Sequence, residues 1–147
     1  MEEDKIIAKL HEVITLELAK WRELAVLEVF GRLNVTVSKE LKSFYLNFTG
    51  PFGQRPYGGE LLHDIVSDDP NIESLTKVCR EQFGFPDQYL VVTNCSDAGE
   101  VTVVDTVSNK VYKVCLECGE DEDLLNGKLE PTWQSFNDFL IDFFDIH

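Results

Sequence analysis

The stretch Gln88-Tyr-Leu-Val-Val-Thr-Asn94 is dense in β-branched and aromatic residues, and Glu100-Val-Thr-Val-Val-Asp105 and Lys110-Val-Tyr-Lys-Val-Cys-Leu116 repeat this character. Residues of these types favour β-strands. Asp97-Ala-Gly99 and Ser108-Asn109 stand between the three segments. Links this short suit hairpins, because a parallel return would need a longer crossover. We therefore expect an antiparallel meander of three neighbouring strands.

After the meander, the chain is expected to pass through an acidic loop into an amphipathic helix between Trp133 and Phe144. The apolar residues of this segment recur at helical steps of three or four. Two starts are equally good: Ser135 with Asp138 as a capping box, and Thr132, which follows a proline. The apolar positions expected to pack on the sheet are Trp133, Phe136, Leu140 and Phe143.

A long amphipathic helix is expected near the start of the chain, from Lys5 to about residue 29. Apolar residues recur there at steps of three or four, and charged residues occupy the rest of the helical wheel. The end of this helix is open, because Leu24 to Phe30 also fits a buried strand and Gly31 fits a helix C-cap. The apolar stripe consists of Ile7, Leu10, Ile14, Leu18, Trp21 and Ala25.

Two further helices are expected before the meander. Ser38 is a suitable N-cap for a helix from Lys39 to Phe48, and Thr49-Gly50-Pro51 ends it. Apolar residues at helical spacing mark another helix from Ile72 to Phe83, which stops before Gly84.

The segments between these helices are short. Phe52 to Gly59 contains three glycines and a proline, which predicts a mobile loop. Glu60 to Val66 fits a short edge strand or a turn. The chain has no internal repeat and no linker-like tract, and 147 residues are a common size for one domain. We therefore expect a single domain over residues 1–147 of the α+β class, with a mostly antiparallel sheet flanked by N-terminal helices and a C-terminal amphipathic helix.

Five segments stand in a characteristic order: Leu41 to Pro51, Phe-Gly-Phe-Pro at 83–86, Gly-Glu-Val-Thr-Val-Val-Asp at 99–105, Val-Tyr-Lys-Val at 111–114, and Ser-Phe-Asn-Asp-Phe-Leu at 135–140. This order resembles the SUKH superfamily, best known as bacterial immunity proteins of polymorphic and contact-dependent toxin systems. The resemblance implies an α+β domain with helices around a mostly antiparallel sheet, and a toxin protein as partner. SUKH-like domains also occur in proteins linked to signalling and cell-wall control, so a regulatory or scaffold role stays open.

Charge is distributed unevenly along the chain. Residues 1–42 hold 8 acids and 7 bases, whereas residues 43–147 hold 19 acids and 6 bases. The later part therefore carries −13 of the net charge of −14. Such a surface repels nucleic acid and anionic membranes, and its natural complement is a basic protein. The plain alternative is that the acidity keeps the protein soluble.

The most acidic stretch, Glu117 to Asp123, is the first candidate for a partner-binding surface. It contains five acids, and no base stands between Lys113 and Lys128. Its spacing does not fit a calcium loop. The stretch is either a solvated loop or a surface that binds clustered Lys and Arg of a partner, with Tyr57 in the glycine-rich loop as an aromatic anchor. The acids expected at the interface are Asp68, Asp69, Asp97, Glu100, Glu117, Glu120, Asp121, Glu122 and Asp123.

Cysteine and histidine are the first residue types to consider for a metal or catalytic site. Cys115 and Cys118 have Cys-x-x-Cys spacing, and Cys79 and Cys95 are the further ligands that a zinc site would need. A second close-spaced pair is absent, so we expect four reduced thiols and no metal or other cofactor. His63 precedes an acid, and such a histidine is more often at the surface or satisfied than a catalytic base.

The N-terminus is acidic and no apolar run reaches the ~20 residues that span a bilayer, so we expect a cytoplasmic protein. Together with the resemblance, these observations predict an immunity protein that is not an enzyme and that neutralises a cognate toxin domain. The acidity favours a basic toxin, and a nuclease fits because it presents a basic groove to phosphates. The alternatives are a regulatory or scaffold module without a toxin partner and, third, a small zinc or thiol enzyme. The oligomeric state is open.

Overall fold

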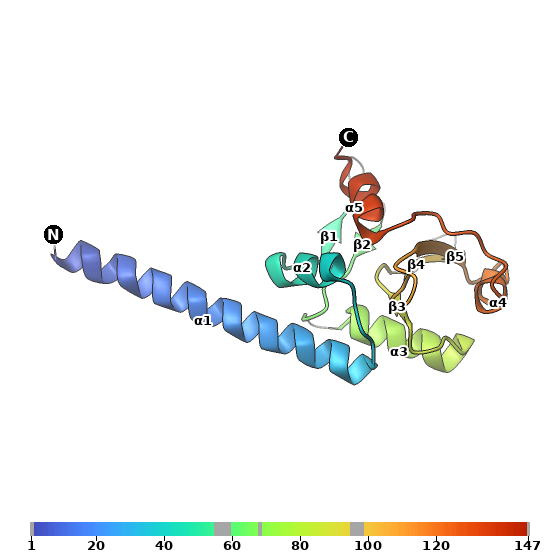
Figure 1. Ribbon diagram of the computed structural model, residues 1–147, viewed down its shortest axis with the longest axis horizontal. Helices are drawn as coiled ribbons and strands as arrows, with labels where there is room; N and C mark the ends of the chain where they lie inside the picture. The colour runs from blue at the N-terminus through green and yellow to red at the C-terminus, as the bar shows by residue number, and fades with distance from the viewer. Residues whose placement is uncertain (1, 55–59, 68, 95–98, 147) are drawn as a thin grey trace.

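Helices precede and follow a small sheet along the chain (Figure 1). The computed structural model describes residues 2–54, 60–67, 69–94 and 99–146, and in the first helix it describes side chains at 5–14 and from 20 onward. The helices are α1 (Glu2–Leu33), α2 (Lys39–Asn47), α3 (Ile72–Phe83), α4 (Glu120–Leu125) and α5 (Phe136–Phe144). The strands are β1 (Phe52–Gly53), β2 (Leu61–Leu62), β3 (Tyr89–Val91), β4 (Glu100–Asp105) and β5 (Val111–Cys115).

The strands β3, β4 and β5 form an antiparallel sheet in that order. Leu90 of β3, for example, pairs with Val104 of β4. β1 and β2 form a separate antiparallel ribbon, and one bridge between Leu62 and Thr93 joins this ribbon to the residues after β3. The α+β fold class predicted from the sequence is confirmed.

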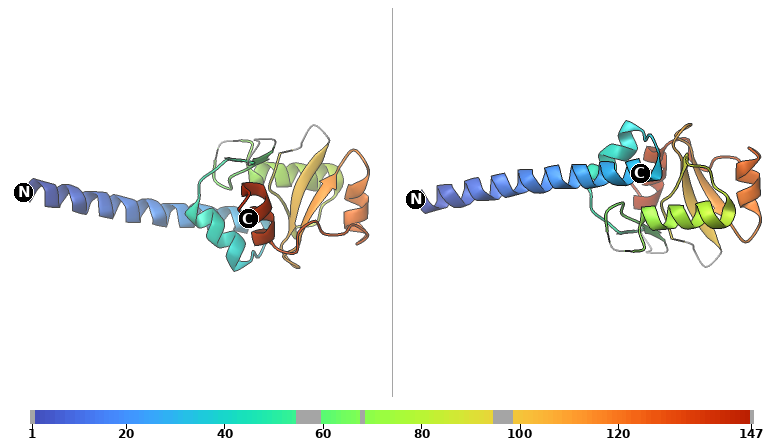
Figure 2. Two further views of the ribbon diagram at one scale, coloured as in Figure 1. Left: turned by 90° about the horizontal axis from the view of Figure 1, so that it is seen from above. Right: turned by 90° about the horizontal axis from the view of Figure 1, so that it is seen from below.

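Both faces of the sheet are covered, which explains why its strands are apolar throughout. Neighbouring positions along a strand point to opposite faces. Leu90 and Val104 belong to a core shared with α1, α2 and α5. Val91 and Val103 belong to a second core shared with α3 and α4. The sheet therefore lies between two helical layers, an arrangement that can be followed in Figure 2.

The predicted starts of α2 and α3 are confirmed by their caps. The Oγ of Ser38 accepts a hydrogen bond from the backbone N–H of Leu41 (3.3 Å). Asn71 and Ser74 form a capping box at the start of α3. Gly84 ends α3 with a φ of 70°, a left-handed conformation that glycine adopts without steric cost. These signals are local, and this is why the sequence alone is sufficient to place them.

The first helix continues through Gly31, past the expected end near residue 29. Asn34 ends it in the left-handed region, with a φ of 58°. The backbone N–H of Val35 donates to the carbonyl of Phe30 (3.2 Å) and closes the last turn. The strand alternative for the last turns and the cap at Gly31 are therefore wrong, because an asparagine three residues later takes the capping conformation.

The last turns of α1 hold this helix to the domain, where Val26 and Leu33 are fully buried. The earlier turns project away from the body of the molecule (Figures 1 and 2). The periodic apolar stripe therefore predicted a helix correctly, but it is not the face that packs on the domain. The described stripe residues that lie exposed, here called the α1 stripe, are Ile7, Leu10, Ile14 and Trp21.

Helix α5 begins at Phe136, later than the apolar spacing predicts. The Oγ of Ser135 accepts from the backbone N–H of Asp138 (3.1 Å), so the first of the two expected starts is correct. Trp133 lies before the helix, and its carbonyl accepts from the N–H of Val111 in β5 (2.9 Å). The expectation that Trp133 is helical is therefore wrong. The buried residues of α5 are Phe136, Phe139 and Phe143, whereas Leu140 is only partly buried.

The glycine-rich segment begins as a strand and not as a loop. Phe52 and Gly53 form β1, which pairs with Leu61 and Leu62 of β2. This pairing confirms the strand alternative for the segment after the glycines. Residues 55–59 of the expected mobile loop lie outside the described residues.

Candidate partner-binding surface

Six of the predicted partner-binding acids belong to one end of the sheet, where β4 starts and β5 ends. Glu100 in β4 pairs with Cys115 in β5. The backbone N–H of Leu116 donates to the carbonyl of Gly99 (2.9 Å), and α4 follows the next turn. Figure 1 shows α4 on the side of the sheet remote from the projecting part of α1. We call this region the acidic end: Glu100, Glu117, Glu120, Asp121, Glu122 and Asp123.

The acidic stretch that was expected to be a loop is partly helical. Gly119, with a φ of 82°, precedes α4, and four acids occupy the first turn of this helix. Carboxylates are favourable there because the N-terminus is the positive end of the helix dipole. Leu124 is 3% exposed and belongs to the core shared with α3. The dipole and this buried leucine together explain why a run of like charges is helical.

The carboxylates of the acidic end have different surroundings. The Oε1 of Glu120 accepts from the backbone N–H of Cys115 (2.8 Å) and closes the end of β5. The side chain of Glu117 lies across Gly99, where a Cβ would be 2.7 Å from the Glu117 Cγ. Within the described part of the chain, residues 121–123 take part in no ion pair. Their charges are therefore not neutralised by a described cation.

Cys115 and Cys118 form a disulfide in the turn between β5 and α4. The N–H of Cys118 donates to the carbonyl of Cys115 (3.3 Å), and the tight turn places the two Cα atoms 5.3 Å apart, within reach of a disulfide. The expectation of four reduced thiols is therefore wrong for this pair. Cys79 is buried on α3, and Cys95 lies outside the described residues. Among the residues that the structure describes, no cluster of potential ligands could hold a metal ion.

An apolar groove of about 290 Å³ borders the acidic end, between α3 and the sheet. Val78 in its wall is 45% exposed, although it belongs to the apolar spacing that marks α3. Glu117 lines the groove and also belongs to the acidic end, so the two surfaces are continuous. The sequence predicts the helix, but it does not indicate that Val78 stays accessible. The main lining residues of this α3 groove are Leu75, Val78, Gln82, Phe83, Leu116 and Glu117.

The other predicted interface residues are not part of the acidic end. Asp69 precedes α3, at the end of that helix which lies away from α4 in Figure 1. The N–H of Ile72 donates to the carbonyl of Asp64 there (3.0 Å), next to β2. Asp68, Asp97 and Tyr57 lie outside the described residues.

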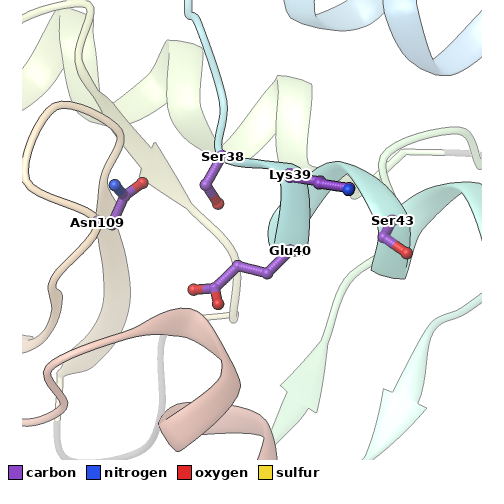
Figure 3. A pocket seen from close by; sticks show the side chains of 5 residues that line it. All are labelled: Ser38, Lys39, Glu40, Ser43 and Asn109. Atoms are coloured by element: carbon purple, nitrogen blue, oxygen red, sulfur yellow. The ribbon is translucent and has the colours of Figure 1, made fainter.

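A pocket of about 610 Å³, lined by polar residues, lies between the start of α2 and the β4–β5 turn (Figure 3). Ser38 in this pocket caps α2. The Oε1 of Glu40 accepts from the backbone N–H of Phe136 (3.1 Å), which is the first residue of α5. Glu40 therefore joins α2 to α5, and the residues that line the pocket include no histidine or cysteine to assist a nucleophile. The lining residues are Ser38, Lys39, Glu40, Ser43 and Asn109.

His63 and Asp64 are both buried, at 4% and 0% exposed. The alternative that His63 lies at the surface is therefore wrong. The Nε2 of His63 has no hydrogen-bond partner among the described residues, and burial lowers the pKa of this side chain. The Asp64 carboxylate accepts from Arg22 (2.7 Å) and from the backbone N–H groups of Gly50 (3.1 Å) and Ile65 (2.8 Å). Because these donors occupy its oxygens, Asp64 does not orient His63 as a catalytic triad would require.

The fold and this surface define an α+β domain whose accessible features are a charged end and an apolar groove. A sequence model of the SMI1 / KNR4 family (SUKH-1) matches residues 23–142. Because this match covers most of the chain, the chain belongs to the SMI1 / KNR4 family (SUKH-1). Members of the family are generally immunity or regulatory domains without enzymatic activity, and immunity domains bind a toxin. The turns of α1 before Glu23 lie outside the match.

A search of curated proteins finds no match for the chain. In the described part of the chain, no helix combines the length and the apolar character that crossing a membrane requires. The family assignment therefore rests on the family model, and the α+β fold agrees with it.

Proposed function

We propose that the protein is a cytoplasmic immunity protein that binds and blocks a cognate toxin domain, and that this toxin is a basic protein such as a nuclease. The acidic end carries the proposal, because its carboxylates border an apolar groove in a chain of the SUKH-1 family. A nuclease presents a basic groove to phosphates. An acidic surface fits such a groove and excludes the substrate from it.

The two parts of the surface are suited to different steps of binding. The uncompensated charges at residues 121–123 attract a basic partner from a distance and raise the association rate. Glu120 contributes less, because its Oε1 is already bonded to the N–H of Cys115. The α3 groove suits an apolar side chain of the partner, and contact there would slow dissociation. Val78 in the wall of this groove is thus a further candidate contact, besides the aromatic anchor proposed at Tyr57.

The first test is neutralisation of a toxin encoded next to this gene. The neighbouring reading frame should encode a long protein with a variable C-terminal domain. Expression of that domain should arrest bacterial growth, and co-expression of this protein should restore it through a complex that survives purification. Growth that stays arrested although both proteins are present would contradict the proposal.

The second test separates electrostatic attraction by the acidic end from the effect of the net charge of the whole protein. Replacing Asp121, Glu122 and Asp123 by Asn, Gln and Asn should slow association with the toxin about tenfold at low salt and flatten its salt dependence. Dissociation should change little. The matched control removes three exposed acids from α1 and α5: Glu12→Gln, Glu28→Gln and Asp138→Asn. If the control slows association equally, the net charge is responsible and not the acidic end.

The third test addresses the groove. Val78→Glu places a charge in the wall of the α3 groove, and we expect at least roughly tenfold faster dissociation of the toxin. Val107→Glu makes the same change at a 74% exposed position in the β4–β5 turn and should have no effect. Equal dissociation rates for the two variants would remove the groove from the interface.

The alternative function is a regulatory or scaffold module without a toxin partner. The projecting part of α1 favours it, because these turns lie outside the matched family domain and offer an additional surface. Affinity purification distinguishes the two functions. A single tightly bound partner that is encoded by the neighbouring gene supports immunity. Several weakly bound partners from distant genes support a scaffold.

A further inference from the structure

The α1 stripe is an apolar surface that the domain itself does not use. Each of its four residues is between 51% and 62% exposed. These positions lie before residue 23, where the match to the family begins, so packing of the family domain does not account for them. Monomeric proteins seldom expose so many apolar side chains along one helix without a partner. The stripe is widened by three exposed neighbours on the same helix, namely Ile6, Val13 and Leu24.

In the sequence, the α1 stripe together with Leu18 has the same spacing in both directions. From Ile7 the steps are 3, 4, 4 and 3 through Leu10, Ile14 and Leu18 to Trp21, all within one continuous helix. Ile14 is therefore its centre, because Ile7 and Trp21 each lie seven residues from it and Leu10 and Leu18 each lie four. In an antiparallel helix pair with a two-fold axis at Ile14, Ile7 of one copy faces Trp21 of the other. This self-complementarity is what an isologous interface requires.

We propose that the protein forms a two-fold symmetric dimer in which the α1 stripes of two copies pack antiparallel. Charge selects this orientation. Residues 43–147 carry a net −13, whereas residues 1–42 carry −1. A parallel pair would place two strongly acidic bodies side by side. The antiparallel pair places them at opposite ends of an overlap about 20 Å long, more than two Debye lengths at physiological salt.

The area that the two helices bury sets the affinity that we expect for the dimer. The overlap of two helices over the stripe and its neighbours buries roughly 1,000 Å² in total, at the lower end for specific interfaces. The dimer should therefore dissociate at roughly 1–100 µM protein. The proposal goes beyond the toxin-binding function and does not depend on it, since the two use different surfaces and no toxin is needed to test the dimer.

Sedimentation equilibrium of the full chain over a range of concentrations is the first measurement. Ile14→Glu places two carboxylates face to face at the two-fold axis and should raise the dissociation constant on the order of 100-fold or more. Val107→Glu changes an even more exposed residue, in the β4–β5 turn away from the α1 stripe, and should leave the dissociation constant unchanged. A monomer at every concentration, or an equal effect of both variants, would overturn the dimer.

The orientation has its own test. A mixture of an Ile7→Cys protein with a Trp21→Cys protein should form a disulfide-linked heterodimer under mild oxidation, with the unchanged protein as the control for the native cysteines. Self-linking of the Ile7→Cys protein alone would indicate a parallel pair and overturn the antiparallel arrangement. Binding of a monomeric protein to phosphatidylcholine vesicles through Trp21 would overturn the dimer in favour of a lipid surface.

Discussion

Arg22 joins three segments that are distant in the sequence. Its guanidinium donates to both oxygens of Asp64 (2.7 and 3.2 Å), to the carbonyl of Tyr45 (2.9 and 3.1 Å) and to that of Phe48 (3.0 Å). The Asp64 side chain is 0% exposed and that of Arg22 is 12% exposed. A buried carboxylate requires such a partner, because an isolated charge is very costly away from water. The pair therefore fixes α1 to α2 and to the segment after β2.

Arg22→Ala should destabilise the protein by about 3–5 kcal/mol, because it leaves the Asp64 carboxylate buried and without its cation. The control is Arg32→Ala on the same helix. Arg32 also forms a two-pronged pair, with Glu73 (2.8 and 3.0 Å), but its side chain is 51% exposed. Exposed pairs contribute little, so the loss should be much smaller. Urea unfolding of both variants measures the difference, and equal losses would contradict the role given to Arg22.

Stability should fall as the pH falls below about 6.5, the ordinary pKa of histidine. Burial lowers the pKa of His63 in the folded protein, so the unfolded chain binds more protons between that lowered value and 6.5. Acidic groups affect stability only at lower pH. The hydrogen bond from Arg32 lowers the pKa of Glu73, so the contribution of Glu73 to stability is lost only below the usual pKa near 4.5.

The check on this prediction is the unfolding free energy between pH 7 and pH 5. His63→Gln removes the titrating group, and the slope of stability against pH should become flatter in this window. Identical slopes for this variant and the unchanged protein would show that His63 does not couple folding to pH.

Among the elements, α5 shows how a helix is held by its aromatic residues. Phe139 is 1% exposed, and its ring lies 4.9 Å from that of Trp133 and 5.8 Å from that of Phe136. Phe139→Ala and Phe136→Ala should each cost about 3–5 kcal/mol, the usual cost of truncating a buried Phe. Ile141→Ala on the same helix removes a side chain that is 40% exposed and should cost less than about 1 kcal/mol. An unchanged thermal midpoint for Phe139→Ala would mean that the face of α5 is misassigned.

Helix ends could be predicted from the sequence where they depend only on residues that are neighbours along the chain. Ser38 and Gly84 mark helix ends through their own backbone and side-chain chemistry. Trp133 was misplaced because it stands three residues before Phe136, so a helical spacing continues across the true helix start. Whether Trp133 continues the helix or pairs with Val111 depends on the tertiary position of β5, which periodicity does not contain.

The candidate site was predictable to a similar extent. The acidic run was visible in the sequence, and it is the feature that favours a basic partner. The bond from the Cys115 N–H to Glu120 was not visible, because it depends on the turn that also brings Cys118 to Cys115. The exposure of Val78 beside Glu117 depends on how α3 crosses the sheet.

On the scale of the whole molecule, the two candidate surfaces lie far apart. The acidic end is on the side of the sheet remote from the projecting turns of α1 (Figures 1 and 2). A toxin bound at the acidic end would therefore not cover the α1 stripe. If both proposals hold, two toxin domains bind one antiparallel dimer, one at each end of the assembly.

A chain that begins at Trp21 should keep the stability of the domain within about 1 kcal/mol at low protein concentration, because the side chains at 5–14 that it lacks are exposed. A chain that begins at Glu23 also lacks Arg22, and it should lose about 3–5 kcal/mol with the buried ion pair. The full chain should become more stable as its concentration rises, since dimerisation favours the folded state, whereas the chain from Trp21 should not. Urea unfolding of the three chains at two concentrations measures both effects. A large loss for the chain from Trp21 at low concentration would mean that the projecting turns belong to the fold.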